Sequence, residues 1–443
     1  LRSIILNNCA ITGLVRPEYH SFFESAYVPV CGFTIFNRRT PNLLGSFIDL
    51  NQFYGADNQP IRLLEAINNH DCGWFYAACS NDFLRIPGNP IAYWISEKAR
   101  GLFEECLPVG QVANAKQGLI TGDNDQFLRF WNEVEFANIG LGVKSRNDAS
   151  ESKKKWFPHH KGGAFRKWYG NHEYVVDWEN DGDKIRSFVD GNGKLRSRPQ
   201  NLDFYFKPAV TWTSLTVASF NGRLCHGGFI YDAKGPMVSP IDQKYLFALA
   251  GLLNCSVTNY LLKLLATTMD YNQGPISKLP WPHNIEEQLS SINNAVKPLE
   301  ATAKSDWDSY ETSWDFINLP LLQPYYRQPT LKATYQKLRT HWRDMTLEMQ
   351  RLEEENNRIF IDAFGLQDEL TPKVALSEIT LTCNPHYRYG GDKSDVELEA
   401  LLLADTMREF ISYTVGCMFG RYALEKPGLV LANQGESVDD YLK

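Results

Sequence analysis

Basic and aromatic side chains alternate in one stretch of the chain, residues 153–170, which reads KKKWFPHHKGGAFRKWYG. Lysine and arginine neutralise phosphate groups, and aromatic rings stack on bases, so this composition is typical of a surface that contacts nucleic acid. The candidate contacts are Lys153, Lys154, Lys155, Lys161, Arg166, Lys167 and Tyr169. A solvated basic loop above aromatic core residues would show the same composition, and the sequence alone leaves both interpretations open.

A second informative stretch, residues 116–131, reads KQGLITGDNDQFLRFW. Between its apolar parts lies a Thr-Gly-Asp-Asn turn, in which glycine permits a left-handed backbone and the Asp and Asn side chains bond nearby amides. We favour a tight turn that joins a strand to a helix. Direct contact with DNA is the alternative, and its candidate residues are Lys116, Thr121, Asp123, Asn124 and Arg129.

No catalytic or metal-binding spacing accompanies these stretches. The histidines lack a carboxylate partner at the spacing of zinc enzymes, and the chain contains neither a Gly-x-Ser-x-Gly elbow nor a phosphate-binding lysine loop. Nine cysteines are scattered without the short paired spacings of zinc sites, which is typical of reduced thiols in the cytoplasm. We therefore expect no catalytic residue and no metal in this chain.

The chain as a whole is acidic, with a net charge of −7 and an isoelectric point near 5.8. This excludes a globally basic nucleic-acid coat, but an acidic scaffold can carry a local basic groove, because only the surface next to phosphate must be positive. The longest apolar run is too short to span a bilayer, so we expect no membrane partner. We expect about two to four packed units and a cytoplasmic location. Because the chain begins Leu1-Arg2-Ser3 without a signal sequence, we also expect it to start inside a longer protein.

The elements that must position these side chains follow from hydrophobic periodicity. An apolar helix at 4–6, a buried strand at 11–15 and an interior strand at 32–36 indicate the end of a doubly wound α/β domain in residues 1–40. Residues 41–110 are interpreted as a connector, with a helix that begins at Ser96.

The remaining elements predict two further regions. Residues 111–283 form an α+β module that ends with helices at 245–253 and 257–265, the second capped by Ser256. Residues 284–443 are predicted to be mostly helical. Their long helices lie at 330–364, where the acidic residues 353–355 should face solvent, and at 396–418.

The order of several motifs resembles the PglX family of BREX phage-defence methyltransferases and, more loosely, single-chain restriction-modification enzymes. The motifs are GLITGDNDQF at 118–127, WFPHHKGGAFRKWYGN at 156–171, VDWENDG at 176–182, LPWP at 279–282 and YTVGCMFGRY at 413–422. The resemblance covers nearly the whole chain. It implies that residues 1–40 end a class-γ methyltransferase core, that residues 111–283 are a target-recognition domain for double-stranded DNA, and that a helical C-terminal region follows.

The resemblance also implies an adenine-specific enzyme that uses S-adenosylmethionine, bound by residues outside this chain. Such enzymes carry a Gly-rich cofactor loop and an Asn-Pro-Pro-Tyr loop that holds the flipped adenine, and neither occurs in order here. Residues 89–93 lack the second proline, and Asn384-Pro385-His386-Tyr387 has histidine in its place. We interpret the latter as a structural turn, because no buried strand leads into the glycine pair at 390–391.

Sequence recognition is therefore the leading hypothesis. The module 111–283 would dock on duplex DNA, while the N-terminal methyltransferase region of the same parent protein would methylate adenine N6, and this portion alone would be inactive. An interaction scaffold is the alternative, in which the helices after residue 285 bind other BREX proteins or a phage inhibitor. Carbohydrate binding is a third hypothesis, and only the 13% content of aromatic residues favours it.

Overall fold

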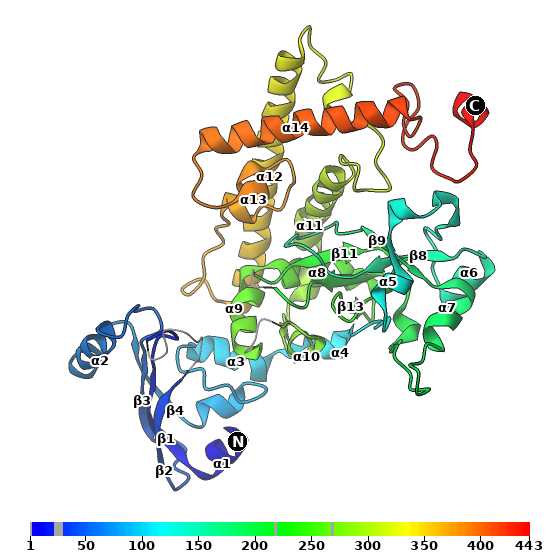
Figure 1. Cartoon of the computed structure of the whole chain (residues 1–443). Helices are drawn as coiled ribbons and strands as arrows, with labels where there is room; N and C mark the ends of the chain where they lie inside the picture. The colour runs from blue at the N-terminus through cyan, green and yellow to red at the C-terminus, as the bar shows by residue number, and fades with distance from the viewer. Residues whose placement is uncertain (1, 22–29, 217–218, 267–269) are drawn as a thin grey trace. The chain divides into compact units, whose positions relative to one another are not determined.

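The computed structural model describes residues 2–21, 30–216, 219–266 and 270–443 (Figure 1). The chain divides into two compact units, Leu1–Pro108 and Val109–Lys443, and each is described by itself.

The first unit is built on a four-stranded sheet with the order β2-β1-β3-β4. The strands are β1 (Ala10–Arg16), β2 (Gly32–Phe36), β3 (Leu44–Asp49) and β4 (Phe75–Cys79). β1 and β3 run parallel, whereas β2 and β4 are antiparallel to their neighbours. The other elements are α1 (Arg2–Asn8), α2 (Asn58–Asn68), α3 (Glu97–Glu105) and the two-residue β5 (Leu107–Pro108). Buried Phe47 of β3 stacks on Tyr93 at 5.1 Å between ring centroids and anchors the core of this unit.

Three predictions for this unit are confirmed, namely the helix at 4–6, the strand at 11–15 and the helix start at Ser96, whose side chain accepts a 3.0 Å hydrogen bond from the Ala99 amide. The interior position predicted for residues 32–36 is wrong. β2 is an edge strand and all five of its residues are exposed, because its aromatic and β-branched composition indicates a strand but not its burial. The sheet also continues across the division expected at residue 40, since β3 and β4 join the sheet of β1. The mixed α/β character is present, and the finer assignment to a doubly wound methyltransferase core stays a prediction.

The second unit contains two further four-stranded sheets. One has the order β11-β10-β13-β6 and is antiparallel throughout, and the other has the order β12-β8-β9-β7, with β12 parallel to β8. The strands of the first are β6 (Ala113–Lys116), β10 (Ala209–Trp212), β11 (Gly222–Cys225) and β13 (Met237–Pro240). Those of the second, named here the β8–β9 sheet, are β7 (Leu128–Phe130), β8 (Trp156–His160), β9 (Tyr174–Asp177) and β12 (Ile230–Tyr231). Short helices around them are α4 (Val109–Val112), α5 (Asn124–Phe127), α6 (Arg146–Glu151) and α7 (Glu179–Arg186).

Helices follow these sheets to the end of the chain. They are α8 (Leu246–Asn254), α9 (Ser256–Leu265), α10 (Gln273–Ser277), α11 (Ile285–Trp307), α12 (Leu331–Phe364), α13 (Pro385–Tyr389), α14 (Asp395–Met418) and α15 (Val438–Leu442), with the two-residue β14 (Pro280–Trp281) before α11. α11 packs against α8 and α12. α14 crosses α12 in Figure 1, where Arg339 of α12 donates a 2.8 Å hydrogen bond to Glu399 of α14.

The two long C-terminal helices are confirmed within a residue of their predicted bounds. Thr330 caps α12 by accepting a 3.2 Å hydrogen bond from the Ala333 amide, and Gly365 ends the helix with a φ of 67°. Two details are wrong. The residue that caps α9 is Cys255, not Ser256, and Glu353 does not face solvent but is 3% exposed.

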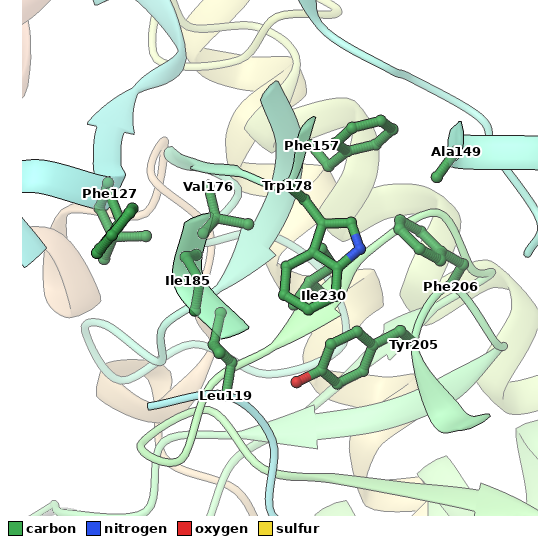
Figure 2. Close-up of a cluster of buried hydrophobic side chains, with 11 residues drawn as sticks. Leu119, Phe127, Ala149, Phe157, Val176, Trp178, Ile185, Tyr205, Phe206 and Ile230 are labelled. Carbon is green, nitrogen blue, oxygen red and sulfur yellow. The ribbon is translucent and has the colours of Figure 1, made fainter. Parts of the chain in front are cut away.

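One face of the β8–β9 sheet packs on the cluster of buried side chains shown in Figure 2. Trp178 lies in the middle of this cluster, with its ring 5.3 Å from that of Tyr205. Gly182 permits this packing, because a Cβ at that position would lie 2.5 Å from the Trp178 ring. The face carries Phe157 and Val176, which are opposite each other in the β8–β9 register.

Within the described part of the chain, no single helix is long and apolar enough to cross a membrane. The helix pair Gln243–Asn254 and Ser256–Leu265, bent by 71°, meets the length and composition criteria only when taken together.

Trp212→Ala should lower the free energy of unfolding by about 3–5 kcal/mol, the usual cost of removing a buried tryptophan. Trp212 is 0% exposed and its Nε1 donates a 2.6 Å hydrogen bond to the Tyr271 carbonyl. Lys153→Ala, at an exposed position, should change stability by no more than about 0.5 kcal/mol. Urea denaturation of both variants checks this, and a Trp212→Ala protein as stable as the parent would contradict a core position for β10.

Candidate nucleic-acid interface

The C-terminal end of the stretch 153–170, residues 166–170, is buried. Arg166 is 6% exposed, and its guanidinium lies 3.3 Å from the Asp306 carboxylate of α11. Lys167 is 5% exposed and forms an ion pair with Glu353 of α12, which also accepts a 2.9 Å hydrogen bond from Trp168 Nε1. The structure therefore differs from the assignment of Arg166 and Lys167 to phosphate contact. Their charges are neutralised inside the protein, as buried charges require.

Tyr169 belongs to the same buried end. It is 9% exposed, and its hydroxyl accepts a 3.3 Å hydrogen bond from Lys304 Nζ of α11. Burial raises the pKa of this phenol, which therefore stays neutral. The structure therefore also differs from the prediction that Tyr169 contacts DNA.

The turn at 121–124 has the structure that the sequence analysis favoured. Gly122 adopts a φ of 82°, and the Asp123 side chain caps α5 by accepting a 3.1 Å hydrogen bond from the Gln126 amide. Thr121 is 3% exposed and donates a 2.7 Å hydrogen bond to Asn124 Oδ1. Asn124 is the exposed side chain of this turn.

The remaining residues that were predicted to contact DNA differ in how much they interact with the rest of the protein. Lys153 is exposed and forms no ion pair with a described residue. Lys154 and Lys155 are half-buried, and Lys155 Nζ lies 3.7 Å from the carboxylate of Asp177. Arg129 and Lys116 are also half-buried. Arg129 donates hydrogen bonds of 2.6 Å to two main-chain carbonyls, and Lys116 Nζ lies 5.5 Å from the centroid of an aromatic ring.

An exposed hairpin at residues 188–198, named here the basic hairpin, carries three cations that the sequence analysis missed. Lys194, Arg196 and Arg198 are exposed and alternate with Leu195 and Ser197. Ser197 is 3% exposed and donates a hydrogen bond to a carbonyl of α7. Because successive side chains of extended backbone point to opposite sides, the three cations project away from that buried contact. None of the three forms an ion pair with any described residue.

Main-chain hydrogen bonds hold the basic hairpin against the turn at 121–124. The Arg196 amide donates to the Phe188 carbonyl at 2.9 Å, and Arg198 and Ile120 exchange hydrogen bonds of 2.7 and 3.1 Å. Gly122 allows the close approach, since a Cβ there would lie 2.8 Å from the Arg196 carbonyl carbon. The hairpin and the turn therefore form one surface.

A half-buried cation and two aromatic rings lie at the end of the β8–β9 sheet. Lys161 Nζ is 5.3 Å from the centroid of the Tyr174 ring, which stacks on Phe130 at 4.8 Å. Phe130 is 44% exposed. Burial lowers the pKa of the Lys161 ammonium, and the nearby carboxylates of Asp232 and Asp125 oppose that shift. Tyr174 and Val176 lie two positions apart on β9, so their side chains project from the same face of the sheet. This face carries the buried cluster, and the basic hairpin packs on the other side of that cluster.

A signal for the basic hairpin was present in the sequence. Asn192-Gly193 is the dipeptide preferred in tight hairpin turns, and it precedes the alternating run Lys-Leu-Arg-Ser-Arg at 194–198. The run contains no aromatic residue, so its composition resembles that of a solvated loop more than the stretch 153–170 does.

The asparagine of the near-match to a methyltransferase motif at 384–387 is engaged by the protein itself. Asn384 is 0% exposed, and its Nδ2 donates 2.8 Å hydrogen bonds to the Leu376 and Ile379 carbonyls. Its Oδ1 accepts a hydrogen bond from the His386 amide at the start of α13. The glycine pair at 390–391 follows that helix and not a strand. These residues therefore do not fit an adenine pocket or a binding site for S-adenosylmethionine, and Asn384 is confirmed as part of a structural turn.

No group of three or more His, Cys, Asp or Glu side chains that could hold a metal ion lies among the residues that the structure describes. Three histidines are instead part of the core. His159 Nε2 lies 3.1 Å from an Asp232 carboxylate oxygen, while the His160 ring stacks on Phe229 at 4.1 Å. Burial lowers the pKa of His160 well below its usual range and that of His172 to about 3.

The fold and its exposed cations define a mixed α/β protein with a helical C-terminal region and a candidate nucleic-acid surface. No family model matches the sequence. The chain is homologous to adenine-specific methyltransferases. It is 33% identical over 410 residues to adenine-specific methyltransferase PglX of Lacticaseibacillus casei (strain Zhang), a match that covers 91% of this chain and 32% of the relative. It is 32% identical over 383 residues to adenine-specific methyltransferase BrxX of Escherichia coli O9:H4 (strain HS), which covers 86% of this chain and 29% of the relative.

The chain thus spans about a third of the length of the curated relatives it matches. Among solved structures, the type IIG restriction endonuclease BpuSI matches 82% of this chain and 45% of its own, with 8% sequence identity and a TM-score of 0.29. That similarity is too low to define the fold. The resemblance to PglX predicted from the sequence motifs is confirmed.

Lys167→Met should destabilise the protein by about 3–5 kcal/mol, because it leaves the Glu353 carboxylate buried without its counterion. Burial already raises the pKa of the Glu353 carboxyl, against the opposing effect of Lys167 and of the hydrogen bond from Trp168. The double variant Lys167→Met/Glu353→Gln should recover part of the loss, since glutamine is neutral and still accepts from Trp168. Urea denaturation of the single and double variants measures this, and equal loss in both would contradict an electrostatic role for the pair.

Stability should fall as the pH decreases from about 6.5 towards about 3. His172 has a folded-state pKa of about 3, so it stays neutral in the folded protein. In the unfolded chain, histidine takes up a proton below about pH 6.5. The unfolded state therefore binds more protons in this range, and the stability present above pH 6.5 is progressively lost. His172→Phe should flatten the dependence of unfolding free energy on pH, and an unchanged slope in this variant would contradict the assignment.

Proposed function

We propose that the basic hairpin and the turn at 121–124 form the DNA-binding surface of an adenine-specific DNA methyltransferase, and that this chain is its target-recognition portion. The observation that carries the proposal is the set of three exposed cations, Lys194, Arg196 and Arg198, which project from one side of the hairpin without an ion-pair partner among the described residues. Homology to PglX and BrxX methyltransferases supports duplex DNA as the binding partner.

Within this surface, the cations and the polar turn have different roles. The three arginine and lysine side chains of the hairpin would contact phosphates, which sets affinity and register but reads no sequence. Asn124, exposed in the adjacent turn, offers an amide that can pair with a base edge, as asparagine does with adenine in the major groove. Lys161, held over Tyr174, would add a further phosphate contact at the end of the sheet.

Methyl transfer itself is assigned to the part of the parent protein outside this chain. S-adenosylmethionine is the cofactor that homology to methyltransferases implies for the family. The N-terminal region of the same parent protein would supply the cofactor loop and the pocket for adenine. A role in phage defence and binding to other BREX proteins are inferred only from the resemblance to the family.

Changing Lys194, Arg196 and Arg198 together to Ala should weaken binding to a DNA duplex and flatten its dependence on salt. Each lost phosphate contact removes about 0.9 from the slope of log K against log salt, so three contacts remove up to about 2.7. Fluorescence anisotropy with a labelled duplex at several salt concentrations measures both quantities.

A matched control removes the same charge elsewhere. Lys297, Arg327 and Lys332 are exposed in the helical region, and their triple Ala variant should keep the parental slope. If both triple variants lose the same affinity, net charge and not the basic hairpin determines binding. If neither changes the slope, the DNA surface lies elsewhere on the protein.

A further inference from the structure

A cavity of about 270 Å³ lies on the face of the β8–β9 sheet opposite the basic hairpin. Pro158 of β8, which lines the cavity, pairs with Val175, whereas Phe157 and Val176 point to the other face and into the cluster of Figure 2. The cavity is therefore separate from the proposed DNA surface. Its aromatic walls are formed by Tyr169, His172, Phe229 and Trp314.

The aromatic walls offer flat surfaces for stacking. The rings of His172 and Trp314 are nearly parallel, with an angle of 12° and 5.7 Å between their centroids. Phe229 is 4.6 Å from the His172 ring and 5.9 Å from the Trp314 ring. Trp314 is only partly buried and lines the cavity. Such walls favour a planar ring as the ligand.

One cation and one carboxylate lie together among the lining residues. Lys304 Nζ is 3.4 Å from an Asp315 oxygen, and the two side chains are 44% and 50% exposed. The three N–H groups of Lys304 already face the Tyr169 hydroxyl and the carboxylates of Asp308 and Asp315, whereas the half-exposed Asp315 carboxylate keeps lone pairs that can accept from the amino group of a nucleobase. Gly227 and Gly228 line the same cavity with φ values of 104° and 86°, and leave that wall free of side chains.

Size and charge restrict the ligand further. Pockets for drug-sized ligands usually measure about 300–1,000 Å³, so this cavity has room for one ring system with a small substituent. Aromatic walls also bind quaternary ammonium groups. Here, however, the Lys304 ammonium already lies 5.0 Å from the centroid of the Tyr169 ring and would repel a second cation.

We propose that this cavity binds a nucleobase that carries an amino group, with its ring against Trp314 and Phe229 and the amino group towards Asp315. The base would come from a free nucleoside or from an unstacked position of a DNA strand. The inference is independent of the DNA-binding role proposed above, because it depends on the other face of the sheet.

Isothermal titration calorimetry of the chain with adenosine and cytidine tests the free source, with ribose as the control that lacks a base. A duplex with one unpaired adenine, compared with the fully paired duplex, tests the DNA source. Trp314→Ala should weaken nucleoside binding by about tenfold or more, the usual loss when a stacking ring is removed. Trp314→Phe should retain most of the affinity, because it keeps an aromatic surface.

Asp315→Ala provides a second variant at an exposed position, and it should also weaken binding while its circular dichroism melting curve stays parental. Binding of adenosine or of the unpaired base that is sensitive to both variants supports the proposal and identifies the source. Absence of binding by every base-containing probe at millimolar concentration overturns it. Equal binding of ribose and adenosine, or binding unaffected by Trp314→Ala, overturns it as well.

Discussion

Two buried ion pairs connect the sheets of the second unit to the helices that follow them. Arg166 and Lys167 are neighbours in one loop, and their carboxylate partners, Asp306 of α11 and Glu353 of α12, lie 140 and 186 residues later in the chain. A charge left unpaired at such positions costs several kcal/mol, so the loop can be buried only when both helices are in place. The sheets and the long helices consequently depend on each other. The basic hairpin packs on one of these sheets through Phe188 and the buried cluster.

This constraint explains why the stretch 153–170 was difficult to interpret from sequence. Local composition is the same for a basic loop in solvent and for one whose cations are paired inside the protein, because the partners are remote in the chain. Nothing near Arg166 indicates Asp306, and the acidic run at 353–355 has the appearance of a solvated helix face although Glu353 is buried. The basic hairpin could be identified from the Asn192-Gly193 turn, whereas only the structure shows that its cations, unlike Arg166, form no ion pair with a described residue.

Features determined by local interactions were predicted well. The helix at 331–364 starts at a threonine cap and ends at a left-handed glycine, and both are encoded within a few residues of the ends. The turn at 121–124 is local in the same way, with Gly122 at positive φ. The predictions that failed concern features that depend on distant parts of the chain. β2 has the composition of an interior strand but lies at an edge, and whether a strand is covered is decided by the rest of the sheet.

Net charge, like local composition, is a poor guide to the function of this chain. A net charge of −7 would oppose DNA at long range, but salt screens charges that lie more than about 8–10 Å away, and exposed ion pairs such as Arg351–Glu348 cancel much of each other's field. DNA at contact distance meets only the local field. The basic hairpin carries three cations, Lys194, Arg196 and Arg198, that pair with no described carboxylate, and one carboxylate, Asp190, that accepts main-chain hydrogen bonds. Its local charge is therefore positive, and this local charge can determine binding where the sum of all charges does not.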